Sequence, residues 1–277
     1  MNNRNFTELI QAKWNEGKFL CVGLDPLVER LPEHLRGGDV GKSVETFLCA
    51  IIDATADLAC CYKPNSAFYD RLGVDGMAVL LRVMEYAKTR APGAALILDA
   101  KRGDIQDTNV THAAVAFDLL GVDAVTVQPY LGSASLEPYL KRKEKGTLVL
   151  CKTSNPGAGE LQDVMVDGLP LYQFVAKRAQ EQWNGNGNCG LVMGATYPKE
   201  LSSVRALGVD LPFLIPGVGA QGGTVAETVA AAKDRRGQGM IINASRAILY
   251  ASSGKDFAEA AAREAKKMHD GIKAALT

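Results

Sequence analysis

Short apolar stretches rich in β-branched residues recur along the chain, and longer segments with helical periodicity separate most of them. We count eight such stretches, at residues 19–25, 59–65, 95–101, 124–129, 147–153, 190–196, 212–218 and 239–245. They are almost continuously apolar rather than alternating, which is typical of parallel strands buried on both faces.

The segments between these stretches have the pattern of amphipathic helices. In residues 42–57 the apolar side chains recur at helical spacing and form one face, and residues 74–90 and 107–121 behave similarly. Eight alternating strand–helix units predict a (β/α)8 TIM barrel. Because no linker or change of composition divides the chain, we expect residues 1–277 to form a single domain. A helix around residues 6–14 should plug or flank the barrel.

The composition narrows the class of protein. The chain has 31 Lys and Arg against 31 Asp and Glu, so its zero net charge gives no general attraction to nucleic acid or to an acidic membrane. We see no signal peptide, and no apolar run reaches the roughly 18–20 residues of a membrane helix. The six cysteines form no CxxC pair and lie mostly in apolar stretches, so we expect reduced thiols and a cytoplasmic protein.

Charged residues gather where the first three predicted strands end, which is where barrels of this class place their chemistry. Asp25 ends the first strand and Lys63 the second, and the third ends in ILDAKRGDI, which contains Asp99, Lys101 and Asp104. Because side chains alternate along a strand, Asp99 and Lys101 should point the same way. One such pair could be a structural ion pair. Charged groups are costly to bury, so several of them on neighbouring strand ends favour a functional site instead.

A carboxylate beside an ammonium group suits decarboxylation without a cofactor. At ~4 Å and an effective dielectric of about 20, Asp99 would repel a substrate carboxylate by roughly 4 kcal/mol. Relief of that repulsion on loss of CO2 is worth about a thousandfold in rate. Lys101 could then protonate the carbon left behind. A Schiff base at Lys101 would need a lowered pKa, which flanking carboxylates oppose.

The segment GVGAQG (217–222) matches the GxGxxG pattern of dinucleotide-binding folds, but its position does not. Such folds place the pattern after the first strand, whereas here it follows the seventh. Barrels commonly bind phosphate after strands seven and eight, where backbone N–H groups, Gln221 and Arg246 could donate. A purely structural turn is the alternative. We therefore expect a phosphorylated substrate and no dinucleotide.

Together these residues resemble the orotidine 5′-phosphate decarboxylases, in the branch with longer chains (type 2). The resemblance runs through nearly all of the chain and rests on FLCVGLDP, YKPNSAFYD, ILDAKRGDI, CKTSNPG, LVMGATYP, IPGVGAQGG and IINASRAILYAS. It implies conversion of orotidine 5′-monophosphate (OMP) to uridine 5′-monophosphate (UMP) and CO2, the last step of de novo UMP biosynthesis. It also implies that the enzyme needs no metal and no organic cofactor.

The resemblance further implies roles for individual residues at the charge cluster. Lys101 matches the proton donor of the family, and Asp99 matches the residue that faces the leaving carboxylate. The family is homodimeric, and each site is completed by the other chain. Asp104, Ile105 and Thr108 match the positions that the partner subunit supplies.

The remaining matches concern substrate binding. Asp25 and Lys63 match ribose-contacting positions, and Ser154 matches the residue that reads the pyrimidine amide. Gln221, Gly222 and Arg246 match the phosphate-binding positions of the family. Two features depart from shorter family members: residues 155–172 form a long loop, which we interpret as a lid over the base, and Ser245 replaces a glycine before the arginine.

Two other readings compete with this one. A related metal-dependent lyase or isomerase acting on sugar phosphates shares the barrel and the Asp-x-Lys-x-x-Asp pattern, and its activity would disappear on chelation. A non-catalytic nucleotide-binding barrel would bind UMP without turnover and would have little use for Lys101.

Overall fold

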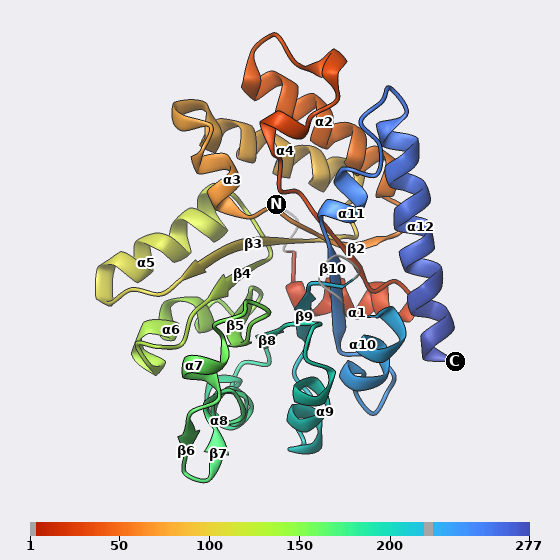
Figure 1. The fold of residues 1–277 in the computed structure, drawn as a ribbon. Coiled ribbons are helices and arrows are strands. Elements are labelled where there is room, and N and C mark those ends of the chain that lie inside the picture. Colours follow the sequence, from red (N-terminus) through yellow and green to blue (C-terminus); the bar gives the residue numbers. More distant parts are fainter. Residues whose placement is uncertain (1–3, 219–223) are drawn as a thin grey trace.

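Eight parallel strands form a closed barrel in the computed structural model, which describes residues 4–218 and 224–277 (Figure 1). The strands are β1 (Leu20–Gly23), β2 (Ala59–Lys63), β3 (Ala95–Arg102), β4 (Ala124–Val127), β5 (Gly146–Lys152), β8 (Cys189–Met193), β9 (Phe213–Pro216) and β10 (Met240–Ala244). β1 pairs with both β2 and β10, which closes the ring. The predicted TIM barrel is therefore confirmed, and each strand overlaps one of the predicted apolar stretches.

The helices form the outer layer around the barrel. They include α2 (Val40–Thr55), α4 (Gly76–Arg90), α5 (Gln106–Ala114), α6 (Ser133–Leu140), α8 (Leu171–Arg178), α9 (Pro198–Ala206), α10 (Val225–Ala232) and α12 (Phe257–Leu276). Asp39 caps the amino end of α2, since its carboxylate accepts from the Lys42 N–H at 2.7 Å, and the predicted apolar face of the helix is buried. The segment predicted as one helix at 107–121 continues after α5 as a π-helical turn, Val115–Leu119. None of the helices in the described residues is long and apolar enough to cross a membrane.

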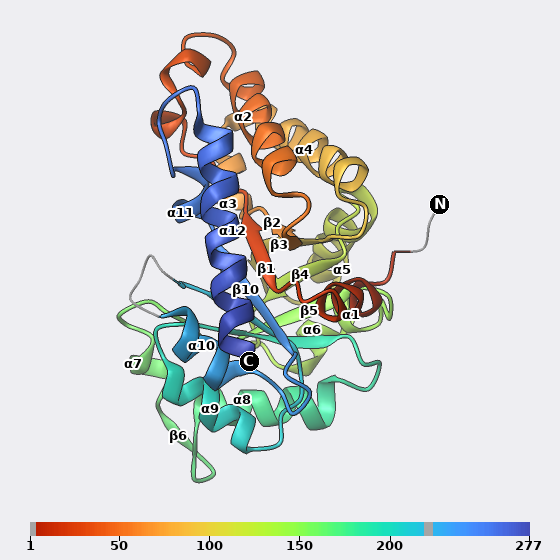
Figure 2. The ribbon, with the colours of Figure 1, turned by 90° about the vertical axis from the view of Figure 1, so that its right-hand side faces the viewer.

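The first helix, α1 (Phe6–Asn15), closes the barrel at the amino ends of the strands. A Cβ on Gly146, the first residue of β5, would lie 2.4 Å from the Phe6 ring, so the two residues are in close contact. The Trp14 indole donates to the carbonyl oxygen of Met240, the first residue of β10, at 2.8 Å. Figure 2 shows α1 on the opposite side of the strands from α7. The expected plug is confirmed, and it leaves the carboxyl ends of the strands open.

Residues 155–172 contain more regular structure than the loop that the sequence suggests. They hold the short helix α7 (Gly159–Gln162) and a hairpin of β6 (Met165–Val166) and β7 (Leu169–Pro170). Asp167 and Gly168 turn the hairpin with φ of 50° and 79°, as a two-residue turn of this kind requires. Closure of this segment over a ligand stays a prediction.

Candidate active site

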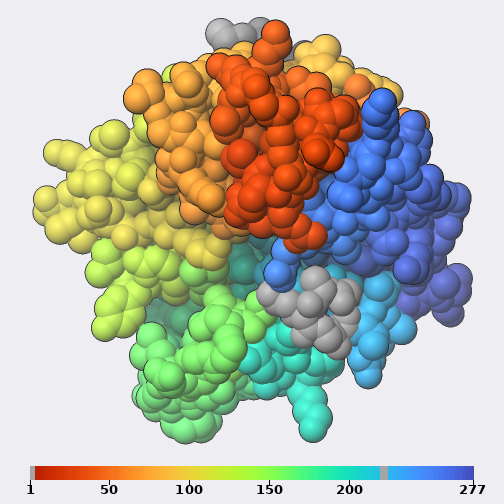
Figure 3. Space-filling model, turned by 45° about the horizontal axis from the view of Figure 1, so that its top comes forward, coloured from red at the N-terminus to blue at the C-terminus, as the bar shows by residue number. Residues whose placement is uncertain are grey.

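The carboxyl ends of the strands surround a cavity of about 210 Å³. Figure 3 looks onto this side of the molecule, where the surface is hollowed between the red and orange N-terminal segments and the green segment around α7. The lining includes residues predicted from the sequence, namely Asp25, Lys63, Asp99, Ser154 and Arg246. These side chains come from five different strand ends, so the barrel topology brings together positions far apart in the sequence.

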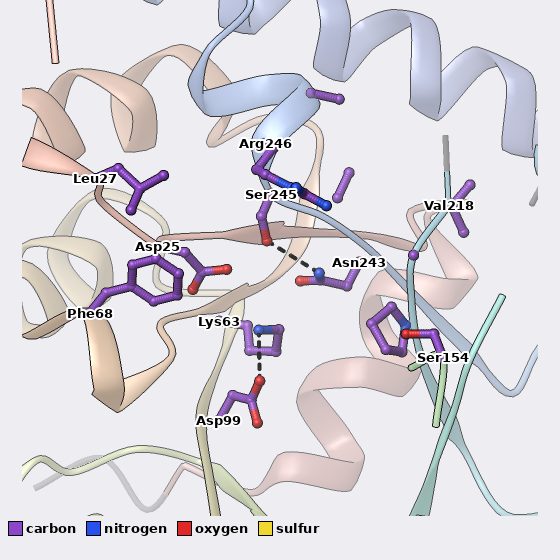
Figure 4. Close-up of a pocket in the computed structure, with 14 residues that line it drawn as sticks. Asp25, Leu27, Lys63, Phe68, Asp99, Ser154, Val218, Asn243, Ser245 and Arg246 are labelled. Atoms are coloured by element: carbon purple, nitrogen blue, oxygen red, sulfur yellow. Dashed lines mark hydrogen bonds and ion pairs between the residues drawn. The ribbon is translucent and has the colours of Figure 1, made fainter. Parts of the chain in front are cut away.

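The Asp99 carboxylate lies at the centre of a network of charges and hydrogen bonds. One oxygen is 2.8 Å from the Lys101 ammonium group and accepts from the Thr126 hydroxyl at 2.8 Å. The other oxygen is 3.3 Å from the Lys63 ammonium group and accepts from the Asn65 amide at 3.3 Å (Figure 4 shows the Lys63 contact). Each carboxylate oxygen therefore faces one ammonium group.

This arrangement keeps the buried groups charged. Burial of Asp99 would raise the pKa of its carboxyl group, but Lys63, Lys101 and the hydrogen bonds with Lys101 and Thr126 outweigh it, so the pKa lies below its ordinary value. Burial of Lys63 would lower its pKa, but Asp25 and Asp99 outweigh it, and the pKa lies above its ordinary value. At neutral pH the cluster therefore holds an ionised Asp99 carboxylate against a protonated Lys63.

The backbone at Lys101 is not that of a regular strand. The pairing of β3 with β4 shifts register between Leu98 and Arg102, and Lys101 has a φ of 45°, which is unusual for a residue with a side chain. The alternation that predicts the same direction for Asp99 and Lys101 is therefore lost at this point. Their contact forms because the Lys101 N–H donates to the Thr126 hydroxyl at 3.0 Å and holds the irregular turn against β4.

Three predicted residues lie outside the cavity of their own chain. Asp104 follows β3, and one of its carboxylate oxygens accepts from the Ile105 N–H at 2.8 Å. Ile105 is 58% exposed, and Thr108 is exposed in the first turn of α5. None of the three lines the cavity or contacts Asp99.

The end of the cavity away from Asp99 holds the start of α11 (Arg246–Leu249), with Ser245 directly before it. Gly217 also lines the cavity. Gln221 and Gly222 lie outside the described residues. A Cβ on Gly23 would lie 1.8 Å from the Ser245 hydroxyl, so only glycine fits beside this serine. Gly23 on the neighbouring strand β1 therefore leaves the space that the Ser245 side chain occupies, where shorter family members have a glycine.

Sequence reasoning missed several residues at the site. Thr126 lies within an apolar strand, where nothing in the sequence distinguishes it from a packing residue. Phe68 lines the cavity from the short helix α3 (Ser66–Asp70) that follows β2, and Leu27 lines it from the loop after β1. Asn243 is 6% exposed on β10, and its side-chain oxygen has no hydrogen-bond partner among the described residues. An asparagine inside an apolar strand is a signal that could have identified this last position.

Comparisons with known proteins agree with the fold and identify the family. The family described as "Orotidine 5'-phosphate decarboxylase / HUMPS family" matches residues 18–263. The chain is 48% identical to the orotidine 5′-phosphate decarboxylase of Janthinobacterium sp. (strain Marseille) over 268 residues, 96% of this chain and 97% of that protein. The solved structure of Leishmania donovani OMP decarboxylase is 37% identical with a TM-score of 0.82, and covers 96% of this chain and 99% of that one.

A second solved structure extends the likeness over the whole chain. It is described as a putative orotidine 5′-phosphate decarboxylase from Streptomyces avermitilis, is 30% identical with a TM-score of 0.83, and covers 100% of this chain and 98% of that one. The chain therefore belongs to the orotidine 5′-phosphate decarboxylase family, in its longer-chain branch, and converts OMP to UMP in pyrimidine biosynthesis.

Proposed function

We propose that Asp99 and Lys101 perform the decarboxylation directly, without a metal or an organic cofactor. The observation that carries this proposal is the ionised Asp99 carboxylate in the cavity wall, held between two ammonium groups. A substrate carboxylate placed beside Asp99 is repelled in the ground state, and loss of CO2 removes the repulsion. Because the lysines fix Asp99, it cannot turn away from the substrate to relieve this repulsion.

Lys101 is the proton donor in this proposal. Its ammonium group lies 2.8 Å from Asp99. When the substrate carboxylate beside Asp99 departs as CO2, the substrate carbon that carried it is therefore within reach of the Lys101 ammonium group. The positive charge also stabilises the negative charge that develops on that carbon. The proton moves from the Lys101 nitrogen to the carbon, and solvent reprotonates the exposed amine.

The rest of the cavity orients the substrate. Arg246 binds the phosphate together with Gln221 and Gly222, and Ser154 binds the pyrimidine. Asp25 and Lys63 both contact the ribose. The positions of the described residues support this assignment, because Arg246, Ser154 and Lys63 line different sides of the same cavity (Figure 4).

We infer that the active enzyme is a homodimer in which Asp104, Ile105 and Thr108 complete the site of the partner chain. All three lie outside their own cavity, and the surface beside them exposes apolar side chains. Ile105, directly before α5, is 58% exposed, and Val110 on α5 is 56% exposed. Tyr130 is 78% exposed before α6, which packs against α5. An apolar surface of this kind suits a second copy of the chain.

Mixing two inactive variants tests the shared site. Lys101→Ala and Asp104→Asn homodimers should each be inactive or severely impaired. Random reassembly should restore about one quarter of the wild-type activity, because half of the dimers are then mixed and each has one intact site. No recovery on mixing, with dimers that demonstrably exchange subunits, would mean that each site uses residues of one chain only.

Assay of OMP decarboxylation in a chelating buffer tests independence from metal. The metal-dependent sugar-phosphate relatives are the alternative, and in residues 4–218 and 224–277 no three His, Cys, Asp or Glu side chains gather as metal ligands would. We expect the same ultraviolet absorbance change with and without chelator. Loss of turnover that added magnesium restores would support a metal requirement.

We also propose a cytoplasmic location, which the free thiols of all six cysteines support.

A further inference from the structure

A buried lysine that the proposed chemistry does not use lies at the end of β5. Lys152 is 1% exposed, and its ammonium group forms an ion pair with Asp163, directly after α7. The same ammonium group lies 5.3 Å from the centre of the Tyr172 ring and 5.1 Å from that of Tyr197. A buried ammonium group is costly unless it is paired, so these contacts fix where α7 can lie relative to β5.

The next residue along the chain is bound to the same helix. The Thr153 N–H donates to the Gln162 side-chain oxygen at 2.9 Å, and the Gln162 amide donates to the Thr153 hydroxyl at 2.8 Å. Two successive residues at the end of β5 are therefore attached to the end of α7. We call Lys152, Thr153, Gln162 and Asp163 the α7 clamp.

Ser154 follows the α7 clamp directly and lines the active-site cavity. On its other side is Gly194, whose N–H donates to the Lys152 carbonyl at 2.7 Å. A Cβ on Gly194 would lie 3.0 Å from both the Cβ and the backbone nitrogen of Ser154. Ser154 is thus confined between the loop after β8 and two residues held by α7.

We propose that Lys152, Gln162 and Asp163 are positioning residues that set Ser154 at the pyrimidine-binding end of the cavity. This inference rests on the proposed role of Ser154 in binding the base. It also revises the view of residues 155–172 as a freely moving lid. Opening at α7 would leave the Lys152 ammonium group buried without its carboxylate, so any movement over ligand is confined to the β6–β7 hairpin.

The test compares a ligand that has the base with one that lacks it. Gln162→Leu should weaken competitive inhibition by UMP about tenfold, because it removes both hydrogen bonds to Thr153, and should leave inhibition by ribose 5-phosphate unchanged. The matched control is Gln180→Leu, two residues after α8, whose side-chain oxygen accepts from the Asp210 N–H at 3.1 Å and which has no hydrogen bond to the end of β5 among the described residues. Lys152→Met, which keeps the buried stem, is a second variant in case Gln162→Leu folds poorly. Unchanged UMP inhibition, or an equal loss for both ligands, in a folded variant would overturn the proposal.

A double-mutant cycle tests whether the effect passes through Ser154. Ser154→Ala should weaken UMP inhibition, and adding Gln162→Leu should cause little further loss. Fully additive losses would overturn an action through Ser154. If Ser154→Ala weakens UMP binding and Gln162→Leu does not, the α7 clamp proposal fails alone. If Ser154→Ala has no effect on UMP, the proposed base contact fails, and this inference with it.

Discussion

The Lys101 ammonium group lies 2.8 Å from the Asp99 carboxylate, although an irregular turn of backbone separates the two residues on β3. Thr126 on β4 contacts both of them, since it accepts from the Lys101 N–H and donates to Asp99. The charges are therefore placed before any substrate arrives. Preorganisation of this kind avoids the cost of reorienting groups during the reaction.

Asp99→Asn should reduce kcat for OMP by about a thousandfold and should also lower KM, since the neutral amide no longer repels the carboxylate of the bound substrate. UMP has no carboxylate to be repelled, so its inhibition constant should change far less. Initial rates and UMP inhibition measured on the same preparation check this. A similar loss for OMP turnover and for UMP binding would show that Asp99 serves binding or folding instead.

Thr126→Val should lower kcat more than it changes KM, because it removes the contact that holds both Asp99 and the Lys101 backbone. It should also raise the pKa of Asp99 and move the acid limb of the rate profile upward. Thr126→Ser keeps the hydroxyl and should restore most of the activity. Thr147→Val on β5 is the matched control, since the buried Thr147 hydroxyl has no hydrogen-bond partner among the described residues. Equal effects of the two valine variants would count against a specific role for Thr126.

The wild-type pH profile should show no limb from Asp99 or Lys63 between about pH 5 and pH 10. The Asp99 pKa is lowered, so its contribution to stability is present above the unfolded value of about 3.9 and is lost as pH falls through the folded value. The Lys63 pKa is raised, so its contribution is complete below about 10.4 and is lost as pH rises through the folded value. Turnover measured across this range tests the absence of a limb, and denaturant unfolding extended below about pH 4 and above about pH 10.4 tests both directions. An activity limb near pH 6 that Asp99→Asn abolishes would contradict the lowered pKa.

Much of the fold follows from the sequence because strands buried on both faces need continuous apolar runs, and these are visible without any structure. Asp25, Lys63 and Asp99 are predictable as neighbours for the same reason, since each ends such a run and all parallel strands end on one side of the barrel. Arg246 is predictable at a phosphate site because barrels commonly bind phosphate after strands seven and eight, whereas the role of Ser154 comes from the family resemblance; the structure puts both residues in the cavity.

Other features depend on tertiary contacts that no local pattern encodes. Thr126 looks like an ordinary strand residue until β3 is placed beside it. The left-handed backbone of Lys101 is imposed by the register shift between β3 and β4. The α7 clamp was not foreseen, because a lysine at the end of an apolar strand gives no indication that Asp163 will bind it. The roles of Asp104, Ile105 and Thr108 in the partner's site stay predictions, which the mixing experiment tests.

Gly23→Ala should impair the enzyme through Ser245, because the added methyl group would overlap the serine hydroxyl. We expect lower thermal stability and weaker binding of phosphorylated ligands, since Ser245 precedes Arg246. Ser245→Gly should be well tolerated alone and should rescue Gly23→Ala. Failure of this second substitution to restore stability would show that another neighbour causes the clash.

The most direct test of the account is the turnover of OMP by Lys101→Ala. Two controls show an intact fold: thermal unfolding of the variant, and UMP inhibition of the activity recovered when it is mixed with Asp104→Asn. If Lys101 donates the proton, the variant should show no measurable decarboxylation at saturating OMP while remaining folded and dimeric. Near-normal turnover from the folded variant would rule out Lys101 as the proton donor and would require another source for the proton.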